Sequence, residues 1–233
     1  MKKHGFTLAE VLVTLGIIGV VSALVMPTFI TNTSEKTVGP KLLKAYSTFQ
    51  NASVAMLTSL DVPDLAKVPG VIASSGAFFT NLGHYMRGSY DATSSIFTGN
   101  DGVTYWLTTN KFDTSVAQYP HEVDLLKSGK DGGPGLLAVD INGTSKPNGV
   151  GKDRFYFHLM HDGSLRPYGG TYDNLVWTKV CPDGATPTDS RNMATCTAHI
   201  INNDGKVGYN LVGMPTINSL GGASQGGDPP ISD

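Results

Sequence analysis

A long apolar segment near the amino terminus limits what this chain of 233 residues can be. Over residues 6–34 the only ionisable side chain is Glu10. As an α-helix, residues 6–29 would be about 36 Å long at ~1.5 Å per residue, enough to cross a hydrocarbon layer of about 30 Å. Because Lys2 and Lys3 precede the segment, the positive-inside tendency keeps the amino end in the cytoplasm and places the rest of the chain outside.

Three interpretations compete for this segment. A cleaved secretory signal has a shorter apolar run, of about 7–15 residues, and no carboxylate near its start. A plain signal anchor has the right length but gives no reason for Glu10, whose charge would cost roughly 2.5–3.5 kcal/mol near a bilayer centre and less near its edge. A carboxylate inside a membrane segment therefore indicates a function that involves a cationic partner.

The third interpretation supplies that partner through a resemblance. The run Met1-Lys-Lys-His-Gly5-Phe6-Thr-Leu-Ala-Glu10 and the apolar residues after it closely resemble the amino-terminal signature of type IV prepilins and type II secretion pseudopilins. The resemblance implies that a membrane aspartyl peptidase cleaves between Gly5 and Phe6, and that the new amino-terminal Phe6 is N-methylated. It also implies that Glu10 of an incoming subunit pairs with the Phe6 ammonium of its neighbour. Inside a low-dielectric fibre, such a pair disfavours subunits that are packed out of register more than it adds net stability to the correctly packed fibre.

Small residues and prolines affect how this helix bends and packs. Gly16 and Gly19 allow close helix approach in lipid. Pro27 removes one helical hydrogen bond and is expected to kink or locally unwind the helix. The Gly39-Pro40 pair predicts a break before the next helix, because proline disfavours the helical conformation at the residue before it.

The chain keeps a helical pattern after this pair and changes to short strands and turns beyond Leu60. Apolar residues recur every three or four positions over 41–60, which predicts a helix whose apolar stripe is buried by a sheet. Helix and strand both remain open for residues 70–90. Asp-Gly pairs lie before or between several later segments and favour tight hairpins. The predicted strands are 103–107, 136–141, 154–159, 164–166, 197–201 and 206–209.

These patterns predict an α+β fold, in which one long amino-terminal helix packs its second half on an antiparallel sheet. This is the pilin-like layout that the resemblance implies. The predicted parts are a cleaved leader at 1–5, a transmembrane or filament-core helix at 6–29, its amphipathic continuation at 30–60, a globular domain at 61–220 and a flexible tail at 221–233.

One loop between two predicted strands contains four oxygen-bearing side chains, Asp140, Asn142, Asn148 and Asp153. Calcium takes roughly six to eight oxygen ligands at about 2.3–2.6 Å, and a glycine-rich loop can turn its carbonyls inward. The stretch resembles a loop of many pseudopilin-like sequences, some of which bind calcium, although it does not match the EF-hand pattern. The alternative is that these side chains cap turns of their own backbone.

Cys181 and Cys196 are the only cysteines of the chain. Both lie in the part that is expected outside the cytoplasm, where an even pair predicts a disulfide. Closing a loop of about 16 residues stabilises a protein by roughly 3 kcal/mol in the chain-entropy model. A zinc site is not expected, because two widely separated cysteines without suitably placed histidines do not make one.

Composition and motifs argue against several function classes. A net charge of −2 and a pI near 6.3 lack the excess of Lys and Arg that a nucleic-acid surface needs. His158 and His161 would lie on opposite faces of a strand and share no metal. No Walker loop, dinucleotide fingerprint or serine elbow occurs, so we expect no enzyme. The aromatic residues could instead stack on a sugar: Tyr105, Trp106, Tyr156, Phe157, Tyr168, Tyr172 and Trp177.

The favoured function is therefore structural. We expect a subunit that is processed at Gly5/Phe6 and polymerises through its amino-terminal helix into a type IV pilus or a type II secretion pseudopilus. The resemblance implies as partners copies of itself and related pilins, the prepilin peptidase, an inner-membrane platform with its ATPase, and membrane lipid before assembly. It implies a single-pass inner-membrane protein that later enters a periplasmic or cell-surface filament. The alternative is a membrane-anchored, carbohydrate-binding or other ligand-binding module that does not polymerise.

Overall fold

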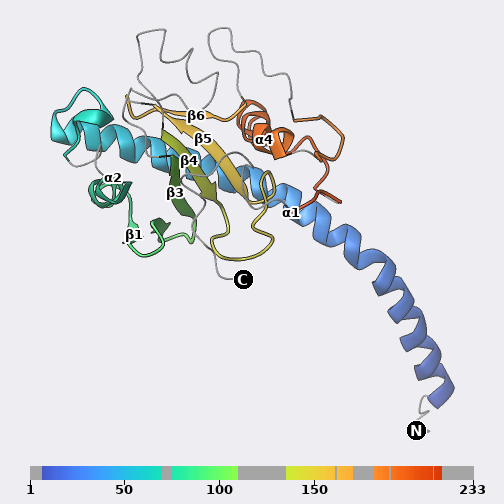
Figure 1. The fold of residues 1–233 in the computed structure, drawn as a ribbon. Helices are drawn as coiled ribbons and strands as arrows, with labels where there is room; N and C mark the ends of the chain where they lie inside the picture. The colour runs from blue at the N-terminus through green and yellow to red at the C-terminus, as the bar shows by residue number, and fades with distance from the viewer. Residues whose placement is uncertain are drawn as a thin grey trace.

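The computed structural model describes residues 7–69, 75–109, 135–160, 162–169, 181–188, 190–211 and 213–216. The carboxyl half of a long helix, α1 (Leu8–Leu60), packs with an antiparallel sheet and shorter helices, which together form the head of the molecule. The amino half of α1 extends away from this head (Figure 1). The α+β, pilin-like fold class that the sequence predicts is confirmed.

Helix α1 has clear stop and start signals. Thr7 is its N-cap residue, and Asp61 ends it in the left-handed conformation, with φ 51° and an N–H that points to the carbonyls of Leu57 and Thr58. Over Leu8–Val25 every side chain is exposed. Beyond residue 37 one stripe is buried at three- and four-residue spacing, as the amphipathic pattern predicts: Val38, Leu42, Ala45, Phe49, Ala52 and Met56.

The predicted break at Gly39-Pro40 is wrong, because α1 continues through both residues. Gly39 is buried, and a Cβ on it would overlap the carbonyl oxygen of Gly205. Close packing on both sides of the proline holds the turn helical, while the Pro40 ring itself is exposed. The backbone is also helical through Pro27, so the helix is not unwound there, and Figure 1 shows a curved helix along this stretch.

The head contains six described strands, each antiparallel to the next one along the chain. Two predicted hairpins are present: Gly102 and Gly163 take positive φ values of 82° and 79° in the turns before β3 and β6, which is the conformation that favours glycine. The strands are β1 (Gly88–Asp91), β2 (Ile96–Gly99), β3 (Thr104–Thr109), β4 (Gly135–Asp140), β5 (Arg154–Leu159) and β6 (Leu165–Pro167).

The core lies between this sheet and the carboxyl half of α1. Phe49 of α1 is fully buried, with its ring 5.5 Å from that of Tyr105 on β3 and 6.1 Å from that of Phe78. Phe78 belongs to α2 (Ser75–Leu82), so the helical alternative holds for that part of 70–90. The short 3-10 helix η1 (Leu65–Lys67) precedes it. The aromatic contacts make the head one hydrophobic unit with α1.

Two strand predictions near the carboxyl end are wrong. Residues 197–201 lie in helix α4 (Ser190–Asn202), and residues 206–209 form no strand. Met193, Cys196 and Ile200 are all fully buried at helical spacing, a period that a window of five residues cannot separate from a strand. The Asp204-Gly205 pair, which suggested a hairpin, ends this helix instead, with both φ values positive.

The sequence did not predict the β1–β2 hairpin. Strand β1 is short and mostly exposed, so it lacks the apolar alternation that marks a strand. Its turn carries no Asp-Gly pair, and Ser95 takes the left-handed conformation there, with φ 58°. The expected leader (1–5) and tail (221–233) lie outside the described residues.

Candidate functional site

The amino end of α1 carries a capping box that holds the Glu10 side chain. The backbone N–H and the hydroxyl of Thr7 donate to Glu10 Oε2 over 2.8 and 2.9 Å. In return, the Glu10 N–H donates to Thr7 Oγ1 over 3.3 Å. This reciprocal arrangement satisfies amide groups that a helix start otherwise leaves unpaired. Thr7 was not among the predicted site residues, although Thr-x-x-Glu before an apolar run is the sequence signature that identifies it.

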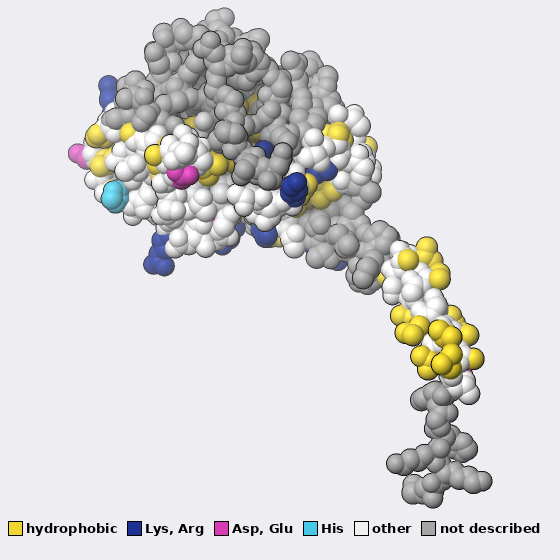
Figure 2. Space-filling model, turned by 60° about the horizontal axis from the view of Figure 1, so that its bottom comes forward, with side chains coloured by type: hydrophobic (Ala, Val, Ile, Leu, Met, Phe, Trp, Pro, Cys, Tyr) yellow, Lys and Arg dark blue, Asp and Glu magenta, His cyan; other side chains and the backbone are white. Residues whose placement is uncertain are grey.

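Around Glu10 the helix offers apolar side chains on all sides. One described helix segment, Leu8–Val25, is long and apolar enough to cross a membrane, and none of it is buried by the rest of the chain. Leu15 and Leu24, for example, have exposed fractions of 61% and 72%. Figure 2 shows these side chains in yellow along the projecting helix. Such a surface requires lipid or other helices to cover it.

The other residues predicted for this end are placed only in part. A Cβ added to Gly16 or Gly19 would meet nothing within 4 Å, so both leave open notches on the exposed helix surface. Pro27 lies within the helical backbone. Gly5 and Phe6 lie outside the described residues.

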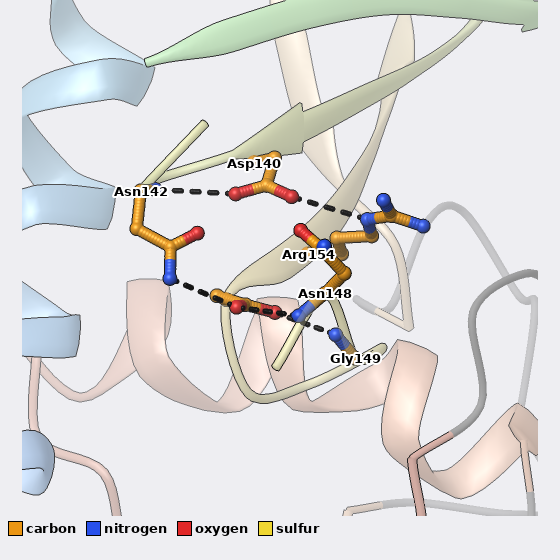
Figure 3. A network of polar contacts seen from close by, with 6 residues as sticks. Asp140, Asn142, Asn148, Gly149 and Arg154 are labelled. Carbon is orange, nitrogen blue, oxygen red and sulfur yellow. Dashed lines mark hydrogen bonds and ion pairs between the residues drawn. The ribbon is translucent and has the colours of Figure 1, made fainter. Parts of the chain in front are cut away.

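The second candidate site is the 141–153 loop, which connects β4 and β5. Figure 3 shows three of the four predicted residues, Asp140, Asn142 and Asn148, close to Arg154 and Gly149. Asp140 ends β4 and Arg154 begins β5, directly opposite each other in the sheet register. Asp140 Oδ2 accepts from Arg154 Nε over 3.1 Å, and Asp140 Oδ1 accepts from the Asn142 N–H over 3.1 Å.

Asp153 organises the remainder of this loop. Its Oδ1 accepts from the Gly149 N–H over 2.6 Å. Its Oδ2 accepts from the Asn148 N–H over 2.9 Å and from Asn142 Nδ2 over 3.0 Å. The structure therefore brings all four predicted side chains together, in the turn-capping role that the sequence left open as the alternative to calcium.

Electrostatics in the loop are unbalanced. Asp140, Asp153 and Arg154 are each at most 3% exposed, and Arg154 also lies 5.5 Å from the Trp106 ring centre. Burial and the neighbouring Asp153 carboxylate raise the pKa of Asp140 to about 7, against the opposing effect of Arg154. Burial likewise raises the pKa of Asp153, while the Gly149 and Asn148 N–H groups oppose the rise. Arg154 thus bonds to Asp140, and its charge also opposes the rise in the pKa of Asp153. A proton or a cation near these two buried carboxylates would lower the cost of their burial.

The loop also supplies oxygen atoms that suit a hard cation. The Asn148 side-chain amide faces Ser145 O, Asp140 Oδ2 and Gly143 O; with its nitrogen toward them it donates over 3.1, 3.1 and 3.3 Å. With its oxygen toward them, the Asn148 amide would add a fourth oxygen to this group, in which Asp140 Oδ2 already accepts from Arg154 Nε. Carboxylate, amide and backbone carbonyl oxygens are the ligands that calcium takes. The described residues contain no group of three or more His, Cys, Asp and Glu side chains that could hold a metal. A calcium ion would therefore depend on amide and carbonyl oxygens, and calcium binding stays a prediction.

The remaining predicted residues have structural positions. A disulfide joins Cys181 to Cys196 and ties α4 to the segment that precedes it. His158 is buried in β5, where its ring stacks on Tyr168, whereas His161 lies outside the described residues. Of the seven aromatic residues considered for sugar stacking, Tyr172 and Trp177 lie outside the described part. The other five are buried: Tyr105, Trp106, Tyr156, Phe157 and Tyr168.

Comparison with known families addresses the amino end. Residues 1–26 match the family model described as the prokaryotic N-terminal methylation motif. The chain carries the type IV pilin and pseudopilin signature. This signature supports a pilin- or pseudopilin-type precursor, suggests a structural subunit, and fits a protein anchored in the inner membrane. The motif implies processing by a prepilin peptidase and assembly into filaments. No curated protein and no solved structure matches this chain.

Proposed function

We propose that this chain is a filament subunit that is cleaved between Gly5 and Phe6, methylated on Phe6, and polymerised through the amino half of α1 into a type IV pilus or a type II secretion pseudopilus. The observation that carries the proposal is the complete exposure of Leu8–Val25 together with a carboxylate held at its start. The prepilin peptidase, an inner-membrane platform with its ATPase, and copies of this or related pilins are the proposed partners.

The exposed apolar side chains in the amino half of α1 can be covered in two apolar environments, a membrane and a fibre. Full burial of one Leu, Ile or Val side chain is worth about 1.5–3 kcal/mol, and this half presents many of them in every direction. Lipid can cover them in the single subunit, and the same helices of other copies can cover them in a fibre. Transfer from lipid to a fibre then changes the apolar surface little, and polar groups decide which register is favoured.

Glu10 is the polar group best placed to set that register. Before assembly, the Thr7 N–H and hydroxyl satisfy its carboxylate within the same helix, which lowers the cost of keeping it at the membrane edge. Cleavage before Phe6 would create an ammonium group next to Thr7. In the fibre we propose that the Glu10 carboxylate binds this ammonium on a neighbouring subunit, which compensates both buried charges.

The variant Glu10→Gln separates charge from capping, because glutamine at this position can keep the bonds to Thr7. We expect removal of residues 1–5 and methylation to continue, as seen by intact-mass measurement, while incorporation into filaments is lost in the native host. Thr7→Ala is the matched control, because it keeps the charge and removes the capping side chain. Wild-type filament yield from Glu10→Gln, or an intact leader on the bulk wild-type protein, would contradict the proposal.

Calcium binding by the 141–153 loop is a second proposal, independent of assembly. The two buried carboxylates of the loop, and the three oxygens around the Asn148 amide, support it. Asp140, Asn148 and backbone carbonyls would hold the ion, with Asn142 and Asp153 supporting the loop. The ion would supply positive charge that the loop otherwise obtains from N–H donors.

A further inference from the structure

A hollow of about 350 Å³ lies beside the long helix at the end of the head from which the projecting half departs. The 141–153 loop and Leu211 form its other walls. We call it the lysine hollow, after Lys41, Lys146 and Lys152 in its lining. Figure 2 shows Lys and Arg side chains, in dark blue, on the head near the point where α1 leaves it.

Charge in the lysine hollow is positive. Its lining carries three lysines and one carboxylate, that of Asp153. Both Asp153 oxygens already accept N–H groups from inside the loop, and its side chain is almost fully buried. Among the described residues, no carboxylate bonds to Lys41 or Lys146, whereas Lys44 in the next turn of α1 pairs with Asp101 over 3.0 Å. The net formal charge of the lining is therefore +2 in a protein whose overall charge is −2.

Part of the lining of the hollow is apolar. Val38 and Ile141 form part of the lining and are themselves 7% and 4% exposed. Pro147 and Leu211 add further apolar surface. A pocket with an apolar floor and convergent polar groups is the usual form of a small-ligand site. The ligand that fits this one has a small uncharged body and a compact anionic group.

From this arrangement we infer that the lysine hollow binds a soluble phosphate monoester. A phosphate monoester carries about −1.5 to −2 charges at neutral pH, which matches the net charge of the lining, and lysine binds phosphate as a point charge. Lys152 lines the hollow, and its Nζ donates to Thr216 Oγ1 over 3.3 Å. Water-exposed Lys41 and Lys146 can turn toward the same anion without breaking a bond to a described carboxylate.

Position along α1 favours a soluble ligand over a lipid headgroup. Lys41 comes 16 residues after Val25, which is about 24 Å along a helix at ~1.5 Å per residue. The headgroup layer extends only about 5–7 Å beyond the hydrocarbon on each side. In an upright subunit the lysine hollow is therefore beyond the lipid phosphates.

Titration of the full-length protein in neutral detergent micelles with glycerol 3-phosphate tests the inference. At constant ionic strength, maintained with chloride, we expect a saturable rise of Tm and saturable binding by calorimetry. The double variant Lys41→Gln/Lys146→Gln should bind about tenfold more weakly for each lysine removed. Lys67→Gln is the matched control, because it removes an equal, exposed charge in η1, beyond the carboxyl end of α1.

Three results would overturn the inference. These are no binding beyond that of chloride, equal affinity in the wild type and the double variant, and a response confined to micelles that contain phosphatidylglycerol. The last result would assign the lysines to lipid. Filament yield of the double variant is measured in parallel, so that this test stays separate from that of the proposed function. A variant that loses phosphate binding but forms normal filaments would leave the proposed role of Glu10 in the fibre unaffected.

Discussion

The two halves of α1 are both rich in apolar residues, yet Leu8–Val25 in one half is exposed, whereas the other half forms the centre of a core. Over Leu8–Val25 apolar side chains surround the helix, and the chain buries none of this segment. Between Val38 and Met56 they follow one face, and that face is packed against the head. The angular distribution of apolar residues, and not their number, therefore separates a helix made for lipid or for other copies from one made for its own sheet.

The same contrast appears in the glycines. A side chain on Gly16 would point into open space, whereas one on Gly39 would collide with the backbone of Gly205. A glycine in the amino half thus keeps room for a partner outside the chain. Gly39, in the carboxyl half, keeps room for a contact already made within it.

The largest expected effect compares Phe49→Ala with Leu15→Ala. Phe49 is fully buried and Leu15 is 61% exposed, so we expect Phe49→Ala to lower the free energy of unfolding of the head by about 3–5 kcal/mol. Leu15→Ala should change it by less than about 0.5 kcal/mol. Denaturant titration of the full chain in micelles, followed by near-UV circular dichroism, measures both. Equal losses would show that the two halves of α1 do not differ as described.

Opening the disulfide ranks second. Cys181→Ser/Cys196→Ser removes the link between α4 and the segment before it, and we expect a loss of roughly 3 kcal/mol. Because α4 packs against the head, the helicity of the amino half of α1 and its membrane insertion should remain unchanged. The same denaturant titration gives the loss, and proteolysis of membrane-inserted protein reports on insertion. Reduced insertion would mean that the halves are coupled.

A smaller loss is expected from Gly39→Ala. The new methyl group overlaps the Gly205 carbonyl and must push the turn after α4 away from α1, at a cost of about 1–3 kcal/mol. Gly16→Ala is the matched control and should leave the Tm of the head unchanged while slightly favouring the helix. Thermal unfolding of the two variants provides the measurement. An unchanged Tm for Gly39→Ala would contradict the tight contact.

Calcium should have the smallest effect, and only on the head. If the 141–153 loop binds the ion, calcium at about ten times its Kd stabilises by about 1.4 kcal/mol, and chelation lowers the Tm accordingly. The variant Asn148→Ala should respond less, because it removes the amide that faces Asp140 and two carbonyls. Magnesium serves as the control cation. No shift on adding or removing calcium would eliminate the ion from this loop.

Local patterns explain how much of the fold could be predicted. The apolar stripe from Leu42 to Met56 and the bounds of β5 follow from periodicity and β-propensity alone. The predicted break at Gly39-Pro40 is wrong because backbone preference at a proline is weaker than the close packing against Gly205. The strand at 197–201 is wrong because five residues do not distinguish the two periods, and contacts with β5 and the disulfide favour the helix.

The candidate site divides in the same way. Glu10, Gly5 and Phe6 could be predicted from sequence because their spacing is local, and their roles stay predictions. Thr7 could have been found by its capping signature. The role of Arg154 could not, because it depends on the antiparallel register that places it opposite Asp140. The lysine hollow combines residues of α1, the 141–153 loop and Leu211, and no local pattern connects them.

The sequence by itself determined that this chain has an apolar helix with one carboxylate near its start, because length, charge and three- or four-residue spacing are properties of neighbours along the chain. Only the tertiary structure decided that α1 runs unbroken past Pro40, that buried Asp140 pairs with Arg154, and that three lysines line one hollow. Those outcomes depend on which distant segments pack together and exclude water. Burial from water determines how much an apolar contact stabilises the fold and how much a buried charge costs.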